Sequence, residues 1–232
     1  MARKREPRFY FSLRSPYSWL AYRELLDKYA DVASAVEWVP FWEPDSRSAE
    51  LLAELGGKFP YSAMSRAKHL YILQDVGRIA EARQATLTWP VDRDPVWEIP
   101  HLGYLVAREQ GRGAEYIALA YQARWEQGRN ICDPVVVADI ATALGLSPDE
   151  VTGASEDPVR RKEGAGILLE ICRDGVFGVP FFVHGFSRFW GLDRLAEFAD
   201  HLRAEMVPAE SMPSSSEPLG VSGDQGHAGG CG

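Results

Sequence analysis

Residues 8–20 of the chain read RFYFSLRSPYSWL. The aromatic and apolar run at 8–13 predicts a strand, and Ser15-Pro16 ends it, because proline suits the first turn of a helix that serine can cap. This helix is expected to continue to about Tyr29, and residues 35–41 predict a second strand. The chain therefore opens with a strand, a helix and a strand. The predicted buried face of the helix consists of Trp19, Leu20, Leu25, Leu26 and Tyr29.

The composition excludes several classes of protein. The chain has 232 residues, with 25 Lys and Arg against 33 Asp and Glu, so its formal net charge is −8. Binding to duplex nucleic acid requires a basic stripe that displaces counterions from phosphates, so this acidic balance argues against nucleic acid as the main partner. Hydrophobic residues make up 46%, which is ordinary for a globular protein, and no apolar run approaches the roughly 20 residues of a membrane span. We therefore expect no membrane partner.

The middle of the chain differs in pattern from its two ends. From about residue 47 to 173 apolar residues recur at helical spacing, and proline and glycine breaks divide this stretch into five or six expected helices. Strand patterns return at 176–184 and 187–190, before a final helix over about 192–203. Neither end has enough strands for a sheet of its own. We therefore predict one α/β domain built from residues 1–45 and 175–206 and split by an all-helical insertion domain, residues 46–174.

The last 26 residues and the cysteines bear on the cellular location of the protein and show no pattern of a functional site. Residues 207–232 hold no aromatic residue, and Pro, Gly and Ser fill 14 of these positions, which predicts a disordered tail. Cys231 lies in this tail, and Cys132 and Cys172 are too widely spaced for a disulfide framework or a metal site of paired thiols. The start of the chain lacks the pattern of a secretory signal. We expect a cytoplasmic protein without a metal site, in which Cys132 and Cys172 are small buried side chains.

The segment Ser15-Pro16-Tyr17-Ser18 stands between the first strand and the first helix, where thioredoxin-type folds carry Cys-x-x-Cys. Oxygen replaces both sulfurs here, so the site cannot perform dithiol–disulfide exchange. The N-terminus of the helix still stabilises an anion such as the thiolate of a bound small thiol, and the Ser15 hydroxyl can donate to the same sulfur. The alternative is that Ser15 only caps the helix.

Two motifs near the end of the folded part add ligand contacts. In Gly178-Val179-Pro180, a cis bond before the proline would turn the N–H and C=O of Val179 outward, where they can pair with an extended peptide. The alternative is a proline on an edge strand. Asp193 falls in the first turn of the last helix, where a carboxylate either caps the helix or holds a ligand ammonium.

Three segments in this order resemble the family of kappa-class glutathione transferases and 2-hydroxychromene-2-carboxylate isomerases, relatives of the DsbA-type thiol oxidases. The resemblance extends from about residue 8 to residue 202. It implies a thioredoxin-like domain with a large helical insertion, which forms a homodimer and binds glutathione without a disulfide step. The segments are Phe9 to Leu20, Lys68 to Asp75, and Gly175 to Pro180 together with Phe189 to Arg194.

The resemblance also implies roles for individual residues. Ser15 would be the catalytic residue and would hold the glutathione sulfur. Val179, next to Pro180, would pair through its backbone with the cysteinyl part of the peptide, and Asp193 would bind the γ-glutamyl ammonium. Lys68 would lie near a glutathione carboxylate, the alternative being a solvated face of an amphipathic helix.

The match to the family is incomplete at two positions. Leu192 stands where the family commonly has a small polar residue, so only its backbone N–H is available for glutathione. Gly56-Gly57-Lys58 occupies the region of a family asparagine that has no clear match. Another small thiol therefore remains an alternative to glutathione.

The substrate site is expected beside the serine. Arg14 replaces the usual apolar residue before Ser15 and adds a charge that can attract a carboxylate substrate. Aromatic residues near the motifs can line an apolar pocket for an aromatic substrate, or can belong to the core. These aromatic residues are Tyr17, Trp19, Trp42, Trp89, Trp97 and Trp190; the residues expected to contact substrate are Arg14, Tyr17, Trp19, Trp89 and Trp190.

The resulting hypothesis is a glutathione-dependent isomerase. It would act on an aromatic or polyketide-like unsaturated acid by reversible thiolate addition, a cis–trans reaction similar to that of the isomerases in this family. One alternative is a kappa-type transferase, in which the thiolate attacks an electrophile and stays attached. Another is a non-catalytic thioredoxin-like binding protein. A disulfide oxidoreductase is not expected, because no cysteine pair lies near the start of the helix.

Overall fold

A four-stranded sheet forms the centre of the structure, a computed structural model that describes residues 6–60 and 64–206. The strand order is β2-β1-β3-β4, with β1 parallel to β2 and antiparallel to β3, and β3 and β4 form a hairpin. Two strands come from each end of the chain, as expected. The predicted tail, with Cys231, lies outside the described residues. The strands are β1 (Arg8–Phe11), β2 (Glu37–Pro40), β3 (Phe181–His184) and β4 (Ser187–Trp190).

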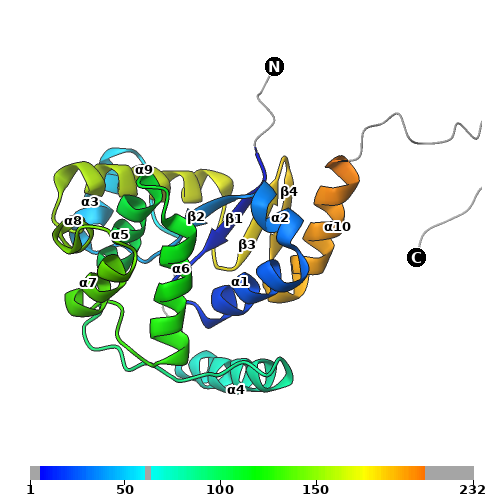
Figure 1. Cartoon of the computed structure of the whole chain (residues 1–232). Helices are drawn as coiled ribbons and strands as arrows, with labels where there is room; N and C mark the ends of the chain where they lie inside the picture. Colours follow the sequence, from blue (N-terminus) through cyan, green and yellow to red (C-terminus); the bar gives the residue numbers. More distant parts are fainter. Residues whose placement is uncertain (1–5, 61–63, 207–232) are drawn as a thin grey trace, which may run out of the picture.

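Three helices come from the same terminal segments as the strands and lie beside the sheet (Figure 1). Stacked aromatic rings tie one of them to the strands. Phe182 of β3 stacks on Phe9 of β1 and on Phe198 of α10, with 4.9 Å between ring centroids in each pair. The helices are α1 (Pro16–Lys28), α2 (Ala30–Ala35) and α10 (Leu195–Met206).

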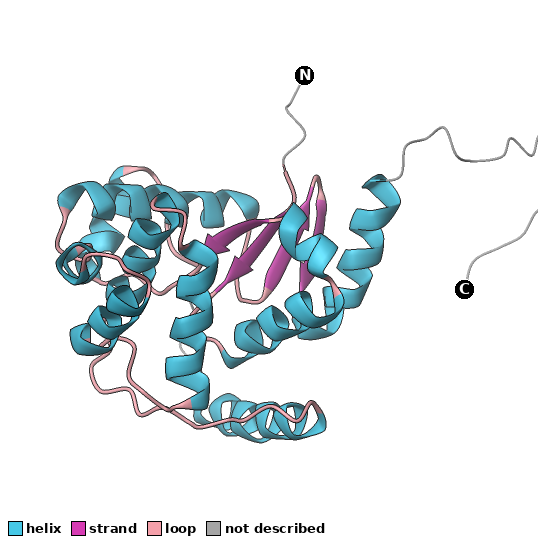
Figure 2. Ribbon diagram, in the orientation of Figure 1, coloured by secondary structure: helices cyan, strands magenta, loops and turns pink. Residues whose placement is uncertain are grey.

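The segment between β2 and β3 is helical, as expected, but it holds more helices than the sequence predicted (Figure 2). Three of them begin at a capping side chain, Asp133, Ser147 or Asp157, that is followed directly by proline and accepts an N–H of the first turn. Among the described helices, none is long and apolar enough to cross a membrane. The elements are α3 (Ser46–Glu54), α4 (Arg66–Ala82), α5 (Glu98–Glu109), α6 (Gly113–Tyr121), a π-helix (Gln122–Glu126), α7 (Pro134–Ala143), α8 (Pro148–Gly153) and α9 (Pro158–Asp174).

The strand expected over 176–184 is shorter in the structure, because β3 begins only at Phe181. Gly175 and Val176 end α9 instead. Gly175 has a φ of 69°, and the Val176 N–H donates to the Ile171 carbonyl, an arrangement typical of helix C-termini. Pro180 has no N–H to give to a sheet. The strand prediction is therefore wrong for residues 176–180.

Three smaller expectations also need correction. Residues 30–35 form the short helix α2, so the second strand covers 37–40 rather than 35–41. Leu26, expected on the buried face of α1, is 50% exposed. The last helix is preceded by a separate 3-10 turn, Leu192–Arg194, so Asp193 lies in this turn and not in α10.

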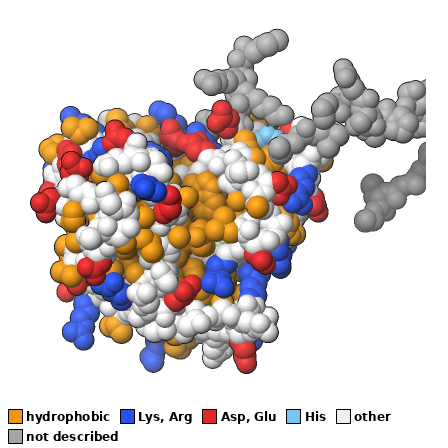
Figure 3. All heavy atoms as spheres, viewed as in Figure 1, with side chains coloured by type: hydrophobic (Ala, Val, Ile, Leu, Met, Phe, Trp, Pro, Cys, Tyr) orange, Lys and Arg blue, Asp and Glu red, His pale blue; other side chains and the backbone are white. Residues whose placement is uncertain are grey.

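The sheet and the helical block share one continuous hydrophobic core. The domain boundaries at residues 45 and 175 stay a prediction. An apolar groove of about 800 Å³ lies between α2 and α6, and hydrophobic side chains gather there at the centre of Figure 3. None of the predicted site residues lines this groove, so the candidate site lies elsewhere. Its lining includes Tyr22, Leu26, Trp38, Tyr104 and Ile117.

Candidate functional site

Ser15 lies where β1 passes into α1 and caps the helix. Its Oγ accepts a hydrogen bond from the Ser18 N–H at 3.2 Å, which confirms the expected cap. The oxygen uses a lone pair in this bond, so the Ser15 O–H can still donate to an anion in front of the helix. Among the described residues the Tyr17 N–H has no hydrogen-bond partner. The first turn of α1 therefore offers an anion one hydroxyl donor and one backbone donor.

The loop that leads from β1 to Ser15 is fixed from behind by two buried side chains of the helical block. The Leu13 N–H donates to Nε2 of His101 on α5 at 3.2 Å, and the hydroxyl of Tyr121 on α6 donates to the Ser12 carbonyl at 3.1 Å. His101 and Tyr121 are almost completely buried. The helices inserted into the chain therefore set the position of Ser15. The sequence analysis did not identify either residue.

His101 holds the loop as a neutral imidazole. Its Nδ1 lies 2.7 Å from the Trp97 carbonyl, which can only accept, so Nδ1 carries the proton and Nε2 is the acceptor for Leu13. Burial lowers the pKa of His101 to about 3; the bond to Trp97 opposes this shift, and the charge of Arg124 adds to it. The imidazole is therefore uncharged at neutral pH.

The other two motifs reach the same end of the sheet as Ser15. The antiparallel register of β1 and β3, continued by one residue, places Phe11 at the end of β1 opposite Pro180. The Gly191 N–H donates to the Pro180 carbonyl at 3.0 Å, which brings the residues after β4 to the same place. Helix α1 also contacts the turn Leu192–Arg194. Segments separated by more than 150 residues thus meet at one end of the sheet.

Val179 presents a free backbone edge at this end. The Val179–Pro180 bond is cis, as the sequence analysis allowed. Within the described part of the chain, neither the N–H nor the C=O of Val179 forms a hydrogen bond. The residue is half-buried, so an extended peptide could pair with this edge.

Asp193 lies beside this edge in the 3-10 turn and is exposed. Its Oδ2 lies 3.6 Å from Nε of the neighbouring Arg194. The turn requires glycine at position 191, because φ there is 107° and a Cβ would lie 2.6 Å from Oδ1 of Asp193. Leu192 is half-buried.

Helix α4, which carries Lys68, meets α1 at a hydrogen bond. The Tyr17 hydroxyl donates to Oδ2 of Asp75 at 2.6 Å. Burial, together with this bond, raises the pKa of Tyr17, and the same bond lowers the pKa of Asp75. Lys68 precedes Asp75 by two helical turns and therefore lies on the face of α4 that contacts α1. Its side chain is exposed.

Tryptophan and arginine side chains gather beside the Ser15 loop and form what we call the Trp–Arg cluster. Its members are Arg14, Trp89, Trp97, Arg124 and Trp125, and the Trp89 ring packs edge-on against Trp125 with 5.8 Å between centroids. The guanidinium carbons of Arg14 and Arg124 lie 5.1 and 5.0 Å from the centroid of the Trp97 ring, and that of Arg124 also lies 4.8 Å from the Trp125 ring. Cation–π attraction holds both guanidinium groups against the rings. The cluster thus brings two guanidinium groups together beside the candidate site.

The two arginines differ in their access to solvent. Arg124, in the π-helix, is 3% exposed and pairs with both carboxylate oxygens of Asp92 at 2.8 Å. Arg14 is 40% exposed and pairs with Glu43 at 2.8 Å. Of the two, Arg14 is the one that a ligand can reach without unfolding the cluster.

The aromatic residues predicted to contact substrate separate into two groups. Trp19 is 1% exposed and stacks on Trp125, so it supports the cluster from behind, in place of the direct substrate contact expected from the sequence. Trp89 is 38% exposed and Trp190 is 52% exposed. Trp190 packs edge-on against Phe177 beside the cis-proline loop, with 4.9 Å between centroids. Trp89 and Trp190 are therefore the predicted tryptophans that face solvent.

The two described cysteines are free thiols, and neither stands at the start of α1. Cys132 is buried, as expected, and burial raises its pKa to about 12. Cys172 is only half-buried, and its Sγ lies 3.2 Å from the Lys58 carbonyl. Neither residue restores the thiol that Ser15 and Ser18 replace.

These features define a class of protein: a helix that starts at the Ser15-Pro16-Tyr17-Ser18 motif, a cis-proline before an antiparallel strand, and a helical block between the two halves of the sheet. A model of the DsbA-like thioredoxin domain matches residues 8–203, and the chain belongs to this family. The expected thioredoxin-like fold is confirmed.

The chain is also similar to particular proteins of known sequence or structure. The chain is 27% identical over 188 residues to a 2-hydroxychromene-2-carboxylate isomerase from Sphingobium xenophagum, covering 81% of this chain and 92% of that protein. A solved structure of 2-hydroxychromene-2-carboxylate isomerase matches with a TM-score of 0.64 and 20% identity, covering 86% and 95% of the two chains. The cytosolic disulfide reductase DsbM from Pseudomonas aeruginosa, solved with GSH, matches with a TM-score of 0.55 and 16% identity, covering 86% and 98%.

Proposed function

We propose that the protein is an isomerase that uses bound glutathione to interconvert the cis and trans forms of an aromatic or polyketide-like unsaturated acid. The observation that carries this proposal is the Ser15 hydroxyl, free to donate at the N-terminus of α1, where dithiol enzymes of this fold have cysteine. Serine removes disulfide exchange but retains a donor for a thiolate. The similarity to an isomerase favours isomerisation.

The residues at this end of the sheet suit glutathione. Val179 offers its unpaired backbone edge to the cysteinyl part of the peptide, and the exposed carboxylate of Asp193 suits the γ-glutamyl ammonium. Leu192 contributes only its backbone, and the exposed Lys68 suits a carboxylate of the ligand. The fold relative solved with GSH supports this choice. Another small thiol is the alternative.

Ser15 has the central role in the mechanism. The chemistry that glutathione supplies when bound is reversible thiol addition to a conjugated carbon, which turns a fixed double bond into one that rotates. The Ser15 O–H and the Tyr17 N–H would hold the sulfur of the bound thiol as a thiolate, and the positive end of α1 would add to this stabilisation. Together they would lower the pKa of the bound thiol, because they favour its charged form.

The Trp–Arg cluster and its surroundings suit the substrate. Arg14 has a half-exposed guanidinium next to Ser15 in the chain, and we assign it to the substrate carboxylate. Trp89 and Trp190 offer exposed rings to the apolar part of the substrate. The Tyr17 hydroxyl is already bound to Asp75, so Tyr17 contributes its ring edge.

The cytoplasmic location and the homodimer remain predictions. Two free thiols, Cys132 and Cys172, agree with a reducing compartment.

The test compares two serine caps. Glutathione binding is measured by calorimetry on the full chain, on Ser15→Ala and on Ser147→Ala, which removes the cap of α8 in the same way. Each substitution costs about 1 kcal/mol of helix capping. We expect only Ser15→Ala to lose the ultraviolet thiolate band of bound glutathione. We also expect its turnover of 2-hydroxychromene-2-carboxylate, the probe substrate, to fall about 100-fold or more, as on removal of an oxyanion donor.

Three outcomes would contradict the proposal. They are an unchanged thiolate band in Ser15→Ala, an equal loss of activity in both variants, and no saturable binding of glutathione by the unmodified protein. The product separates isomerase from transferase, because an isomerase returns the free thiol and a transferase consumes it. Glutathione found attached to the product would favour the transferase.

A further inference from the structure

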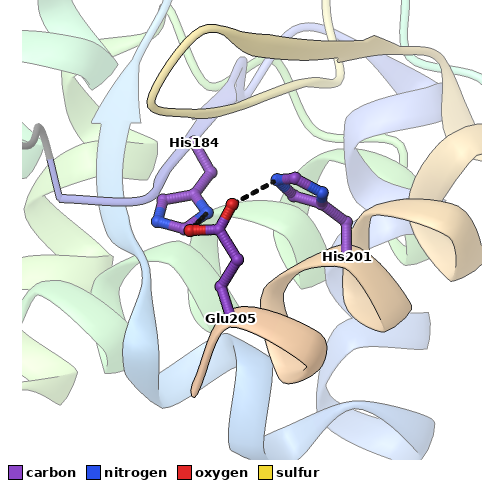
Figure 4. Close-up of side chains that lie close together, drawn as sticks. All are labelled: His184, His201 and Glu205. Atoms are coloured by element: carbon purple, nitrogen blue, oxygen red, sulfur yellow. Dashed lines mark ion pairs between the residues drawn. The ribbon is translucent and has the colours of Figure 1, made fainter. Parts of the chain in front are cut away.

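A second cluster of reactive side chains lies away from Ser15, between β3 and α10. His184 is the last residue of β3, and His201 and Glu205 lie one turn apart on α10, which packs against β3 and β4. The spacing of four residues places His201 and Glu205 on one face of the helix. Figure 4 shows both imidazole rings beside the Glu205 carboxylate. We propose that His184, His201 and Glu205 bind a zinc ion.

The distances between ligand atoms fit one shared ion. Nδ1 of His184 lies 3.7 Å from Oε2 of Glu205, and Nε2 of His201 lies 3.6 Å from Oε1. Both separations are too long for hydrogen bonds. Ligands about 2.0–2.2 Å from a tetrahedral zinc lie about 3.3–3.6 Å from one another. One ligand atom from each of the three residues lies within 4.8 Å of the others, so small side-chain rotations complete the geometry.

The chemistry of the donors selects the metal. Two imidazole nitrogens and one carboxylate oxygen suit zinc better than calcium or magnesium, which prefer oxygen ligands. Three protein ligands leave a fourth position for water or another donor. His184 is buried, and the centroid of the Phe189 ring lies 5.4 Å from that of the His201 ring, so one wall of the site is apolar.

Zinc bound at His184, His201 and Glu205 would stabilise the fold, and this effect does not depend on the thiol chemistry proposed at Ser15. A metal held by these residues joins the end of β3 to the C-terminal half of α10, whereas the turn Leu192–Arg194 lies before the opposite end of that helix. Because the unfolded chain does not keep the three ligands together, zinc binding stabilises the folded state.

Calorimetric titration of Zn²⁺ into the metal-free full chain tests the proposal. The variants are His201→Gln and Glu205→Gln, and the matched control is Asp200→Asn, which removes one exposed carboxylate from the same helix. We expect one equivalent of zinc to bind, with affinity reduced about 10-fold or more in each ligand variant and unchanged in the control. Zinc should also raise the thermal midpoint of the unmodified protein and the control, but not of the ligand variants.

Glu205→Gln is the decisive variant, because Glu205 is exposed and glutamine keeps its shape. Circular dichroism of each variant verifies the fold before the titration. Equal zinc affinity in all four proteins would place the metal on other histidines or cysteines and overturn the proposal. Binding that does not saturate would overturn it as well.

Discussion

The loop that carries Ser15 meets two regions of opposite character. On one side, His101 and Tyr121 hold its backbone through buried hydrogen bonds made by uncharged groups. On the other side, the Trp–Arg cluster places two guanidinium groups against aromatic rings, and one of them, on Arg14, is half-exposed. The hydrogen bonds that position the loop and the guanidinium groups at its surface belong to different residues, and the two regions meet at Trp97, whose carbonyl accepts from His101 and whose ring carries Arg14 and Arg124. Changes on the uncharged side should alter stability, and changes at the exposed arginine should alter ligand binding.

The largest expected effect is a loss of folding stability at low pH, caused by protonation of His101. The pKa of His101 is lowered to about 3 in the folded protein, from its ordinary value of 6.5. The unfolded chain therefore takes up a proton at higher pH than the folded one, so this stability is fully present above about pH 6.5 and is lost as pH falls toward 3. The shift corresponds to about 4–5 kcal/mol at most. Urea unfolding between pH 7 and 4 measures the loss.

His101→Gln isolates this contribution. Glutamine offers a neutral donor and a neutral acceptor but does not titrate, so the variant should lose less stability than the unmodified protein over the same range of pH. Equal pH slopes in the two proteins would show that His101 is not the group that titrates.

The second effect concerns the buried arginine of the cluster. Arg124→Met keeps an apolar stem but leaves Asp92 without its two hydrogen bonds. Removing one partner of a buried ion pair costs about 3–5 kcal/mol, and we expect the lower end, about 3 kcal/mol, because Asp92 is 25% exposed and can regain water. Chemical denaturation measures this change. A loss below about 1 kcal/mol would mean that the cluster does not depend on Arg124 for its stability.

The sequence was most informative where a single residue type has a strong local consequence. Ser15-Pro16 marked the start of α1, and Val179-Pro180 marked the backbone edge, because capping and proline chemistry act over a few residues. The resemblance of three segments to a known family then supplied the fold.

The rest depended on contacts between distant segments. His101 gave no local signal, because its role comes from a bond to Leu13, 88 residues away. Trp19 and Trp190 looked alike in sequence, yet one stacks in the core and the other is half-exposed. The strand predicted over 176–184 was too long, because Gly175 and Val176 end helix α9 and do not belong to the sheet. Burial and pairing of this kind follow from tertiary packing, which periodicity alone does not specify.

The smallest expected change in stability concerns the exposed Arg14. The expected change in substrate binding at this residue rests on the proposed function. Arg14→Gln removes a surface ion pair and should cost less than about 1 kcal/mol. If Arg14 holds the substrate carboxylate, KM for 2-hydroxychromene-2-carboxylate should rise about 10-fold, as on loss of one charged hydrogen bond, with little change in kcat.

Arg23→Gln is the matched control for this measurement. Arg23 is 43% exposed, pairs with Glu126 at 3.2 Å and lies 5.6 Å from the centroid of the Trp19 ring, so it repeats the surroundings of Arg14 without lying next to Ser15. Steady-state kinetics give KM for both variants, and urea unfolding gives their stability. Together they show whether any exposed arginine, or only the one next to Ser15, affects substrate binding. An equal rise in KM in the two variants would show that general positive charge, and not Arg14 itself, attracts the substrate. A rise confined to Arg14→Gln, at unchanged stability, would assign substrate binding to the exposed side of the loop and loop position to the buried side.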